Sequence, residues 1–329
     1  MDTRRIGDIE VSARGFGGWA IGGPFAAPDG KAAGWGEVDD GESIAAIRAA
    51  FDAGITLFDT ANVYGTGHSE KVLAGALGNR RSEIVLATKW GNTMREEDRV
   101  LTGGDGSVEG MRRSLEDSLR RLNTDYVDLF QFHLNDYDGP EIGELCDALE
   151  ELVAAGKIRA YGWSTDFPDR ATKWLNGPNY QAVQTEINVL NDNPGIIEVA
   201  EANGLACLNR GPLAMGLLSG KYGATSQITG ADVRHASPDW LRYFDNGVPT
   251  AGFLDMLSSV RDILTTGGRS LVQGALAWLW GRSEANIPIP GVRTVAQATE
   301  NAAAMSYGPL TKAQMSEIAA LLGRNGSSA

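Results

Sequence analysis

The sequence contains little cysteine and no long apolar run. Only two cysteines occur among 329 residues, Cys146 and Cys207, which is too few for a disulfide framework and lacks the spacing of a metal site. No segment reaches the roughly 18 apolar residues that a membrane span needs, and residues 1–8 lack the apolar core of a signal peptide. We therefore expect a soluble cytoplasmic protein with no membrane partner and no metal.

Positive charge is also scarce. The chain has 29 lysines and arginines against 42 aspartates and glutamates, a formal net charge of −13. A nucleic-acid or anionic-membrane surface would require clustered positive charge, so we expect no nucleic-acid partner. A hydrophobic content of 43% suffices for a large core, and we expect residues 1–329 to form one domain. The composition leaves the oligomeric state open.

Short β-rich runs alternate with helical patterns along the whole chain. Such alternation predicts a parallel sheet with crossover helices, and eight units predict an α/β fold of the (β/α)8 TIM-barrel type. An N-terminal β-hairpin, with residues 4–6 and 10–12 flanking Gly7-Asp8, is expected to close the barrel's bottom. The eight strand candidates are residues 14–18, 55–58, 84–88, 126–132, 158–163, 181–185, 205–208 and 286–289.

Apolar residues at helical spacing indicate helices that face a core. Two such sets are Ile44, Ile47 and Phe51, and Val108, Met111, Leu115, Leu119 and Leu122. Thr294 with Gln297, and Thr311 with Gln314, fit the capping box, and residues 312–322 should form a terminal helix. The glycine-rich residues 19–38 and the proline-containing residues 211–250 are predicted as long functional loops at the top of the barrel.

Polar residues follow three successive strand candidates. Asp59 and Tyr64 follow the second, Lys89 the third and His133 the fourth. Since strand carboxyl ends form the active-site face of such barrels, these side chains could converge. A lysine cation lowers the pKa of a nearby tyrosine, an aspartate can neutralise that lysine, and a histidine can orient a substrate oxygen. This set supports hydride transfer to a carbonyl with proton delivery from Tyr64.

Each residue also has a plain structural interpretation. An aspartate after a strand often caps a loop, a single histidine is more often structural than catalytic, and Tyr64 with Lys89 could be a solvated pair. Four such coincidences at three successive strand ends are much less probable than one.

Three segments in this order resemble the signatures of the aldo-keto reductases: FDTANVYG (58–65), TKW (88–90) and DLFQFHLND (128–136). The resemblance extends across nearly the whole chain. It implies that Asp59, Tyr64, Lys89 and His133 form a catalytic tetrad with Tyr64 as general acid and base. It also implies NADPH or NADP+ laid across the barrel mouth, with the nicotinamide near Tyr64.

The resemblance also implies a set of cofactor-binding positions. Ser164 and Gln184 match the family's nicotinamide contacts, and Thr165 or Asp166 would substitute for its usual asparagine. NRGPLAMGLLSGK (209–221) resembles the pyrophosphate loop, with Arg210 where an aromatic residue usually stacks on the nicotinamide. IPIPGVRTVAQATEN (287–301) resembles the adenosine-phosphate site. From these two segments the cofactor-binding residues are Asn209, Arg210, Pro212, Leu213, Gly216, Leu218, Lys221, Gly291, Arg293, Gln297, Glu300 and Asn301.

Substrate identity is less constrained. Trp19, Trp35, Trp90 and Asp136 are candidates for the pocket because they lie on top-face loops, although the tryptophans could instead pack those loops. Such a mixed aromatic and polar pocket would admit aryl aldehydes, sugars or cyclic ketones.

The sequence also permits three rival interpretations. Residues 15–20 fit G-x-G-x-x-A, the dinucleotide-fold fingerprint, but the Gly-Gly-Pro that follows opposes the helix which that fingerprint needs. A barrel lyase could use Lys89 as a Schiff-base nucleophile, without needing the phosphate-site signatures. A nucleotide-sensing binding module with little turnover stays open.

Overall fold

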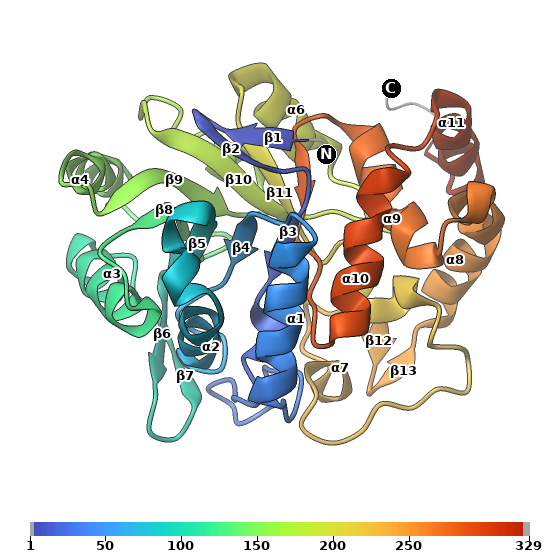
Figure 1. Ribbon diagram of the computed structural model, residues 1–329, viewed down its shortest axis with the longest axis horizontal. Helices are drawn as coiled ribbons and strands as arrows, with labels where there is room; N and C mark the ends of the chain where they lie inside the picture. Colours follow the sequence, from blue (N-terminus) through green and yellow to red (C-terminus); the bar gives the residue numbers. More distant parts are fainter. Residues whose placement is uncertain (1–2, 325–329) are drawn as a thin grey trace.

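The computed structural model describes residues 3–324 and is built around eight parallel strands (Figure 1). All eight predicted runs form strands, with their ends moved by no more than two residues, so the barrel prediction is confirmed. The strands are β3 (Gly15–Gly17), β4 (Leu57–Asp59), β5 (Val85–Trp90), β8 (Val127–Phe132), β9 (Ile158–Ser164), β10 (Tyr180–Glu186), β11 (Ala206–Arg210) and β14 (Asn286–Pro288).

The barrel closes between its first and last strands through a glycine. The backbone N–H of Gly17 donates to the carbonyl of Pro290 at 2.9 Å, and Gly17 forms a parallel bridge with Gly291. A Cβ at Gly17 would lie 2.6 Å from the carbonyl oxygen of Ile289, so no larger residue fits without moving the backbone. The segment that mimics a dinucleotide fingerprint therefore closes the barrel, and only the single 3-10 turn η1 (Trp19–Ile21) follows it.

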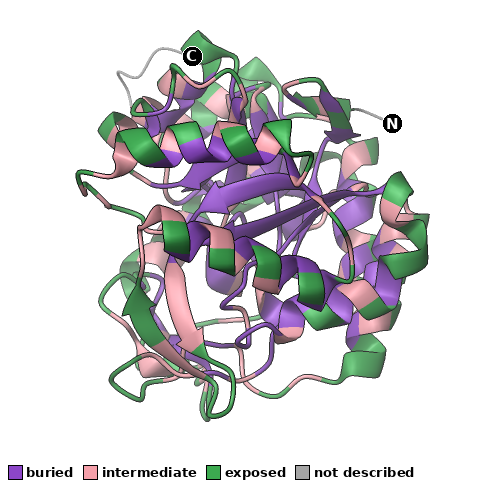
Figure 2. Cartoon of the chain, turned by 90° about the vertical axis from the view of Figure 1, so that its left-hand side faces the viewer, coloured by how far each residue is buried: buried purple, intermediate pink, exposed green. Residues whose placement is uncertain are grey.

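Small and branched apolar side chains fill the barrel interior, while larger ones pack between the sheet and the helices. The hairpin of β1 (Thr3–Ile6) and β2 (Ile9–Ser12) contributes Ile6, Ile9 and Val11 to the interior cluster. It therefore closes the bottom as predicted, and the buried centre is continuous from hairpin to strands (Figure 2).

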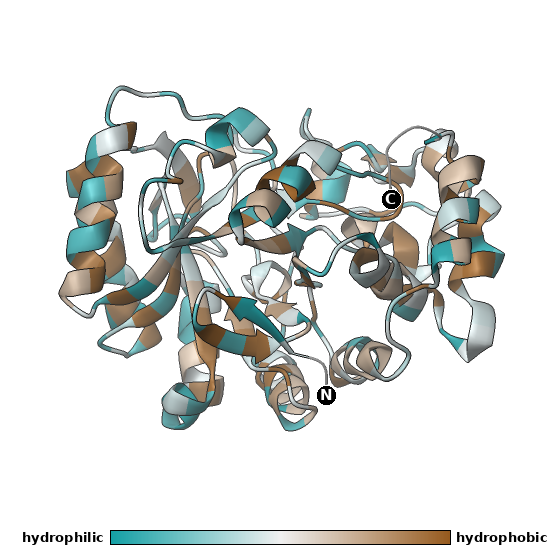
Figure 3. Cartoon of the chain, turned by 90° about the horizontal axis from the view of Figure 1, so that it is seen from above, coloured by the Kyte–Doolittle hydropathy of each residue, from teal (hydrophilic) through white to brown (hydrophobic). Residues whose placement is uncertain are grey.

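Amphipathic helices surround the strands. Ile47, Met111 and Leu115 are fully buried, as their helical spacing predicts, and hydrophilic faces of the helices point outward (Figure 3). The helices are α1 (Asp40–Asp52), α2 (His68–Leu77), α3 (Val108–Leu122), α4 (Ile142–Ala154), α5 (Pro168–Ala171), α6 (Pro194–Asn203), α7 (Val233–Ala236), α8 (Ala251–Leu264), α9 (Leu271–Arg282), α10 (Val295–Ala303) and α11 (Lys312–Leu321). The 3-10 segments η2 (Gly78–Glu83), η4 (Thr266–Gly268) and η5 (Ala304–Ser306) connect them. No helix within residues 3–324 is long and apolar enough to span a membrane.

The two predicted capping boxes differ in outcome. At Thr311 both halves form with Gln314. At Thr294 the hydroxyl accepts from the backbone N–H of Gln297, but the Gln297 amide accepts from the N–H of Arg293 rather than from that of the cap residue. That box is therefore incomplete, and the prediction was wrong in this half.

The long loops carry more structure than the sequence suggests. Residues 211–250 contain η3 (Ala214–Ser219), α7 and the hairpin of β12 (Phe244–Asp245) with β13 (Val248–Pro249). They are joined to residues 19–38, since the N–H of Val233 donates to the carbonyl of Gly34 at 2.7 Å and Arg234 lies 4.7 Å over the Trp35 ring. A further hairpin, β6 (Asn92–Arg95) with β7 (Val100–Gly104), was not predicted.

Candidate active site

Alternation along each strand decides which polar side chains reach the barrel mouth. On β5 the inward residues Val85 and Ala87 belong to the interior cluster, and Lys89 continues that face. By the same period of two, His133 follows the inward Leu129 just beyond β8. Asp59 is the last residue of β4 and points to the same inward side as Leu57. Tyr64 lies on the loop that follows β4.

The Lys89 ammonium connects three of the four predicted tetrad residues. It is fully buried and donates to Asp59 Oδ1 at 2.5 Å, to the carbonyl of Thr60 at 2.8 Å and to Tyr64 Oη at 3.3 Å. These contacts use all three ammonium donors. Burial alone would lower the pKa of Lys89, but the Asp59 carboxylate and the Tyr64 hydroxyl raise it above its ordinary value, so the side chain stays charged.

The pKa of Tyr64 moves opposite to the expected direction. Burial raises it above its ordinary value, and the Lys89 cation lowers it by less. Lys89 therefore lowers the pKa of Tyr64, as the sequence predicts, but the desolvation of the phenolate raises that pKa by more. Tyr64 consequently holds its proton at neutral pH.

His133 faces Tyr64 edge-on, with ring centroids 6.0 Å apart and an interplanar angle of 85°. Burial lowers the pKa of His133 well below its ordinary value, and the cations of Lys89 and Arg210 lower it further. The imidazole is therefore neutral. Its Nδ1 is buried and no partner for it exists in the described part of the chain.

Two buried amides that hold Asp59 complete this cluster. Gln131 Nε2 and Gln184 Nε2 donate to Asp59 Oδ2 at 2.9 and 3.0 Å. Gln184 is thus placed in the site as predicted, but its amide nitrogen contacts the tetrad. Gln131 was missed, although it lies on the inward face of β8 between Leu129 and His133, which the period of two would have indicated.

Of the predicted nicotinamide contacts, Ser164 continues the inward face of Ala160 and is buried at the top of β9. The Thr165 hydroxyl donates to the carbonyl of Asn135 at 2.5 Å. Asp166 accepts from Thr185 Oγ1 at 2.8 Å and pairs with Arg210. Both proposed substitutes for the family's asparagine are therefore already engaged.

Arg210 and Asn209 lie on opposite faces of β11. Arg210 points inward, and besides Asp166 it lies 3.8 Å from Glu186. Asn209 points outward and donates to Asn286 Oδ1 at 2.8 Å. Its side chain is therefore turned away from the mouth, because inward and outward residues alternate along a strand, and a cofactor contact at Asn209 stays a prediction.

The segment resembling a pyrophosphate loop forms a tight turn. Met215 and Gly216 adopt positive φ angles of 53° and 91°, which permit a sharp reversal at a cost for the methionine. Pro212 and Leu218 are buried beneath the turn, Leu213 and Gly216 are partly exposed, and Lys221 is exposed. The cation of Lys221 is therefore available to a ligand.

At the other predicted phosphate site, the Arg293 guanidinium donates to the backbone carbonyls of Trp35, at 3.1 Å, and Glu37. Glu42 Oε1 accepts from the N–H of Val295, in the first turn of α10, at 3.1 Å. No carboxylate in residues 3–324 pairs with Arg293, so its guanidinium forms no ion pair with the nearby Glu300 in that range.

The remaining adenosine-site predictions surround this helix start. Gly291 is exposed, Gln297 and Glu300 are half-buried, and Asn301 is buried. The Glu300 carbonyl accepts from Gln273 Nε2 at 3.3 Å. The structure therefore leaves Gln297 and Glu300 partly accessible, while Asn301 is enclosed.

Aromatic side chains line one side of the mouth. The Trp19 ring stacks near Tyr64, with centroids 6.1 Å apart, and lies edge-on to Trp35 at 5.3 Å. Trp240, which was not predicted, lies 6.1 Å from Trp19 and is 54% exposed. We define Trp19, Trp35 and Trp240 as the aromatic wall.

Two pocket predictions do not fit this wall. Trp90 is fully buried and stacks at 4.3 Å on Phe132, between the sheet and the helices. Since Lys89 points inward, its neighbour must point outward, and the prediction for Trp90 was wrong. Asp136 is exposed, and its carbonyl accepts from Arg170 Nε at 3.3 Å; no contact joins it to the tetrad or to the aromatic wall within the described residues.

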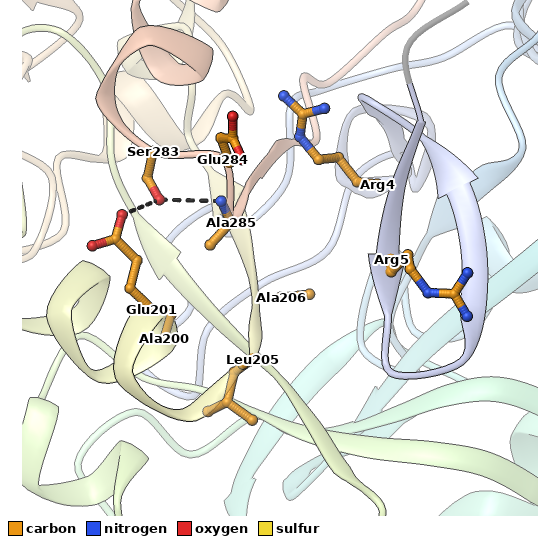
Figure 4. Close-up of a pocket in the computed structure, with 10 residues that line it drawn as sticks. Arg4, Arg5, Ala200, Glu201, Leu205, Ala206, Ser283, Glu284 and Ala285 are labelled. Atoms are coloured by element: carbon orange, nitrogen blue, oxygen red, sulfur yellow. Dashed lines mark hydrogen bonds between the residues drawn. The ribbon is translucent and has the colours of Figure 1, made fainter.

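A separate hollow lies at the opposite end of the barrel (Figure 4). It has a volume of about 460 Å³ and lies between Arg4 of the N-terminal hairpin and the segments that precede β11 and β14. Because it is at the amino ends of the strands, it does not contact the tetrad. Across residues 3–324 we find no group of three or more metal-ligating side chains.

The chain was compared with known families and proteins. The model of the Aldo/keto reductase family matches residues 15–322. The aldo-keto reductase YhdN of Bacillus subtilis is 33% identical over 310 residues, covering 90% of this chain and 86% of that protein. The aldo-keto reductase yakc [NADP(+)] of Schizosaccharomyces pombe is 28% identical and covers 97% of this chain and 90% of its own length.

Among solved structures, the glycerol dehydrogenase AKR11B4 from Gluconobacter oxydans superposes with a TM-score of 0.82 at 29% identity. The match covers 100% of this chain and 97% of that one. The range matched by the family model includes all eight barrel strands, and the solved structure agrees with the barrel fold. This chain therefore belongs to the aldo/keto reductase family of oxidoreductases.

Proposed function

We propose that the chain transfers hydride between NADP(H) and a small aldehyde, ketone or alcohol, with Tyr64 as general acid and base. The observation that carries the proposal is the Lys89 ammonium, which is saturated by Asp59, the Thr60 carbonyl and Tyr64. The buried Lys89 ammonium, whose charge Asp59 neutralises, donates one hydrogen bond to the Tyr64 hydroxyl and can therefore stabilise a transient tyrosinate.

The residues around the mouth fit NADP(H) by their chemistry. Lys221 and Arg293 can neutralise phosphates, Ser164 can bind the nicotinamide carboxamide, and Arg210 can stack on the ring. Arg210 pairs with Asp166 and lies 3.8 Å from Glu186, so two carboxylates restrict where its guanidinium can move. When bound, the cofactor supplies or accepts the hydride.

The protein's part in reduction is to bind the carbonyl oxygen and protonate it. His133, which is neutral, orients that oxygen by a hydrogen bond, and Tyr64 donates its proton as negative charge develops there. The raised pKa of Tyr64 keeps the proton in place until then. Lys89 stabilises the resulting tyrosinate, and alcohol oxidation uses the same groups in reverse.

A Schiff-base lyase is the less supported alternative. A nucleophilic lysine must be neutral, whereas the contacts of Lys89 raise its pKa and occupy every ammonium proton. A nucleotide-sensing module differs from an enzyme only in turnover.

The deciding experiment is NADPH consumption with a panel of aryl aldehydes, hydroxylated aldehydes and cyclic ketones. We expect steady turnover with at least one group. The aromatic wall favours the aryl aldehydes, because flat rings can stack on Trp19 or Trp240. NADPH binding without turnover on any substrate would support the sensing module, and no NADPH binding would contradict the proposal.

A further inference from the structure

Asp59 and the two glutamines form a closed triangle of hydrogen bonds below the mouth. Gln131 Nε2 and Gln184 Nε2 both donate to Asp59 Oδ2, and Gln184 Nε2 also donates to Gln131 Oε1 at 3.0 Å. The three residues are at most 2% exposed. They come from β4, β8 and β10, so the triangle connects three separate parts of the barrel.

The chemistry of a carboxylate fixes how both amides are turned. An ionised Asp59 only accepts hydrogen bonds, so each glutamine must present its nitrogen to it. Gln184 then spends both N–H donors, one on Asp59 and one on Gln131. Its oxygen accepts no hydrogen bond from any group in residues 3–324. That oxygen is also not completely enclosed by the protein, so it can still accept a hydrogen bond at the open end of the barrel.

We propose that Gln131 is a positioning residue for hydride transfer. It holds the Gln184 amide with its oxygen outward, where that oxygen can accept a hydrogen bond from the carboxamide NH2 of the nicotinamide. The inference rests on the proposed function, because it concerns the same cofactor site. It assigns Gln131 no contact with substrate or cofactor; Gln131 acts through Gln184 and, by its bond to Asp59, through the orientation of Lys89.

The test compares two ligands that share the adenosine end. In Gln131→Met, we expect NADPH affinity, measured by fluorescence titration, to fall about three- to tenfold, as for the loss of one ordered hydrogen bond. Adenosine 2′,5′-bisphosphate, which lacks the nicotinamide, should bind unchanged. Gln181→Met, at the amino end of β10, where the side chain donates to the carbonyl of Pro178 at 2.6 Å, is the matched control and should alter neither affinity.

Equal weakening of both ligands would reduce Gln131 to a structural role, and unchanged NADPH affinity would overturn the inference outright. If Gln131→Met does not fold, Gln131→Asn shortens the amide by one methylene and should give the same selective loss. The wild-type assay with NADPH and carbonyl substrates is independent of these variants. If the wild type is active but the Gln131 variants bind NADPH as tightly as the wild type, only the role of Gln131 is contradicted.

Discussion

Replacing Lys89 by methionine should move the pH profile of alcohol oxidation upward. Oxidation needs the tyrosinate form of Tyr64, and a cation beside a phenol lowers its pKa, so removing the cation raises that pKa. At the observed 3.3 Å between Lys89 Nζ and Tyr64 Oη, Coulomb's law gives an attraction between the ammonium and the tyrosinate of about 5 kcal/mol at an effective dielectric constant near 20. The uncovered charge of Asp59 acts in the same direction.

The assay is the alcohol-oxidation rate at saturating cofactor, from neutral to strongly alkaline pH. We expect the alkaline rise of Lys89→Met to lie at least about 2 pH units above that of the wild type. Since Asp59 would be left buried and unpaired at a cost of about 3 to 5 kcal/mol, circular dichroism must first show that the variant is folded. The double variant Asp59→Asn with Lys89→Met removes both charges and should shift less. A profile of Lys89→Met that superimposes on the wild type would refute the reasoning.

Further predictions concern the phosphate site and two buried arginines. Arg293→Ala should weaken NADPH binding at least about tenfold and scarcely affect NADH binding. Glu42→Gln removes a carboxylate from the same helix start and should therefore tighten NADPH binding. Fluorescence titrations in which the affinities for both cofactors change equally would contradict these expectations. Arg14 is fully buried with no carboxylate partner inside residues 3–324, and burial lowers its pKa to about 9, so Arg14→Met should raise the free energy of unfolding by about 1 to 3 kcal/mol. Arg121→Met should instead lower it by about 3 to 5 kcal/mol, because Arg121 neutralises the buried Glu70 at 2.6 Å. Urea unfolding measures the free energy of unfolding of both variants. A change in the same direction for Arg14→Met and Arg121→Met would refute the distinction drawn between the two arginines.

The barrel and the strand-end positions of Asp59, Lys89 and His133 could be predicted because both depend on local periodicity. Each strand is a short β-rich run, and the carboxyl ends of parallel strands meet on one face. Asp59, Lys89 and His133 therefore needed only the strand ends to be located correctly. The candidates Trp90 and Asn209 were chosen by their position near a strand end alone, and the alternation along the strand turns both side chains away from the barrel interior.

Contacts between distant segments could not be read from the sequence. The net pKa of Tyr64 depends on how far burial outweighs Lys89, which is a property of the packed site. The pairing of Arg210 with Asp166 joins two positions that depart from the family pattern, and neither position alone indicates the other. The Arg293 contacts with Trp35 and Glu37 likewise depend on how residues 19–38 pass over the barrel.

The most direct test of the central claim is the turnover of Tyr64→Phe with NADPH and the best carbonyl substrate of the panel. This variant removes one hydroxyl and keeps the ring that packs beside Trp19. We predict that it folds and binds NADPH like the wild type but reduces the substrate roughly 10² to 10⁴ times more slowly, as expected for loss of a positioned acid. Near-normal turnover in Tyr64→Phe would contradict the assignment of Tyr64 as the proton donor.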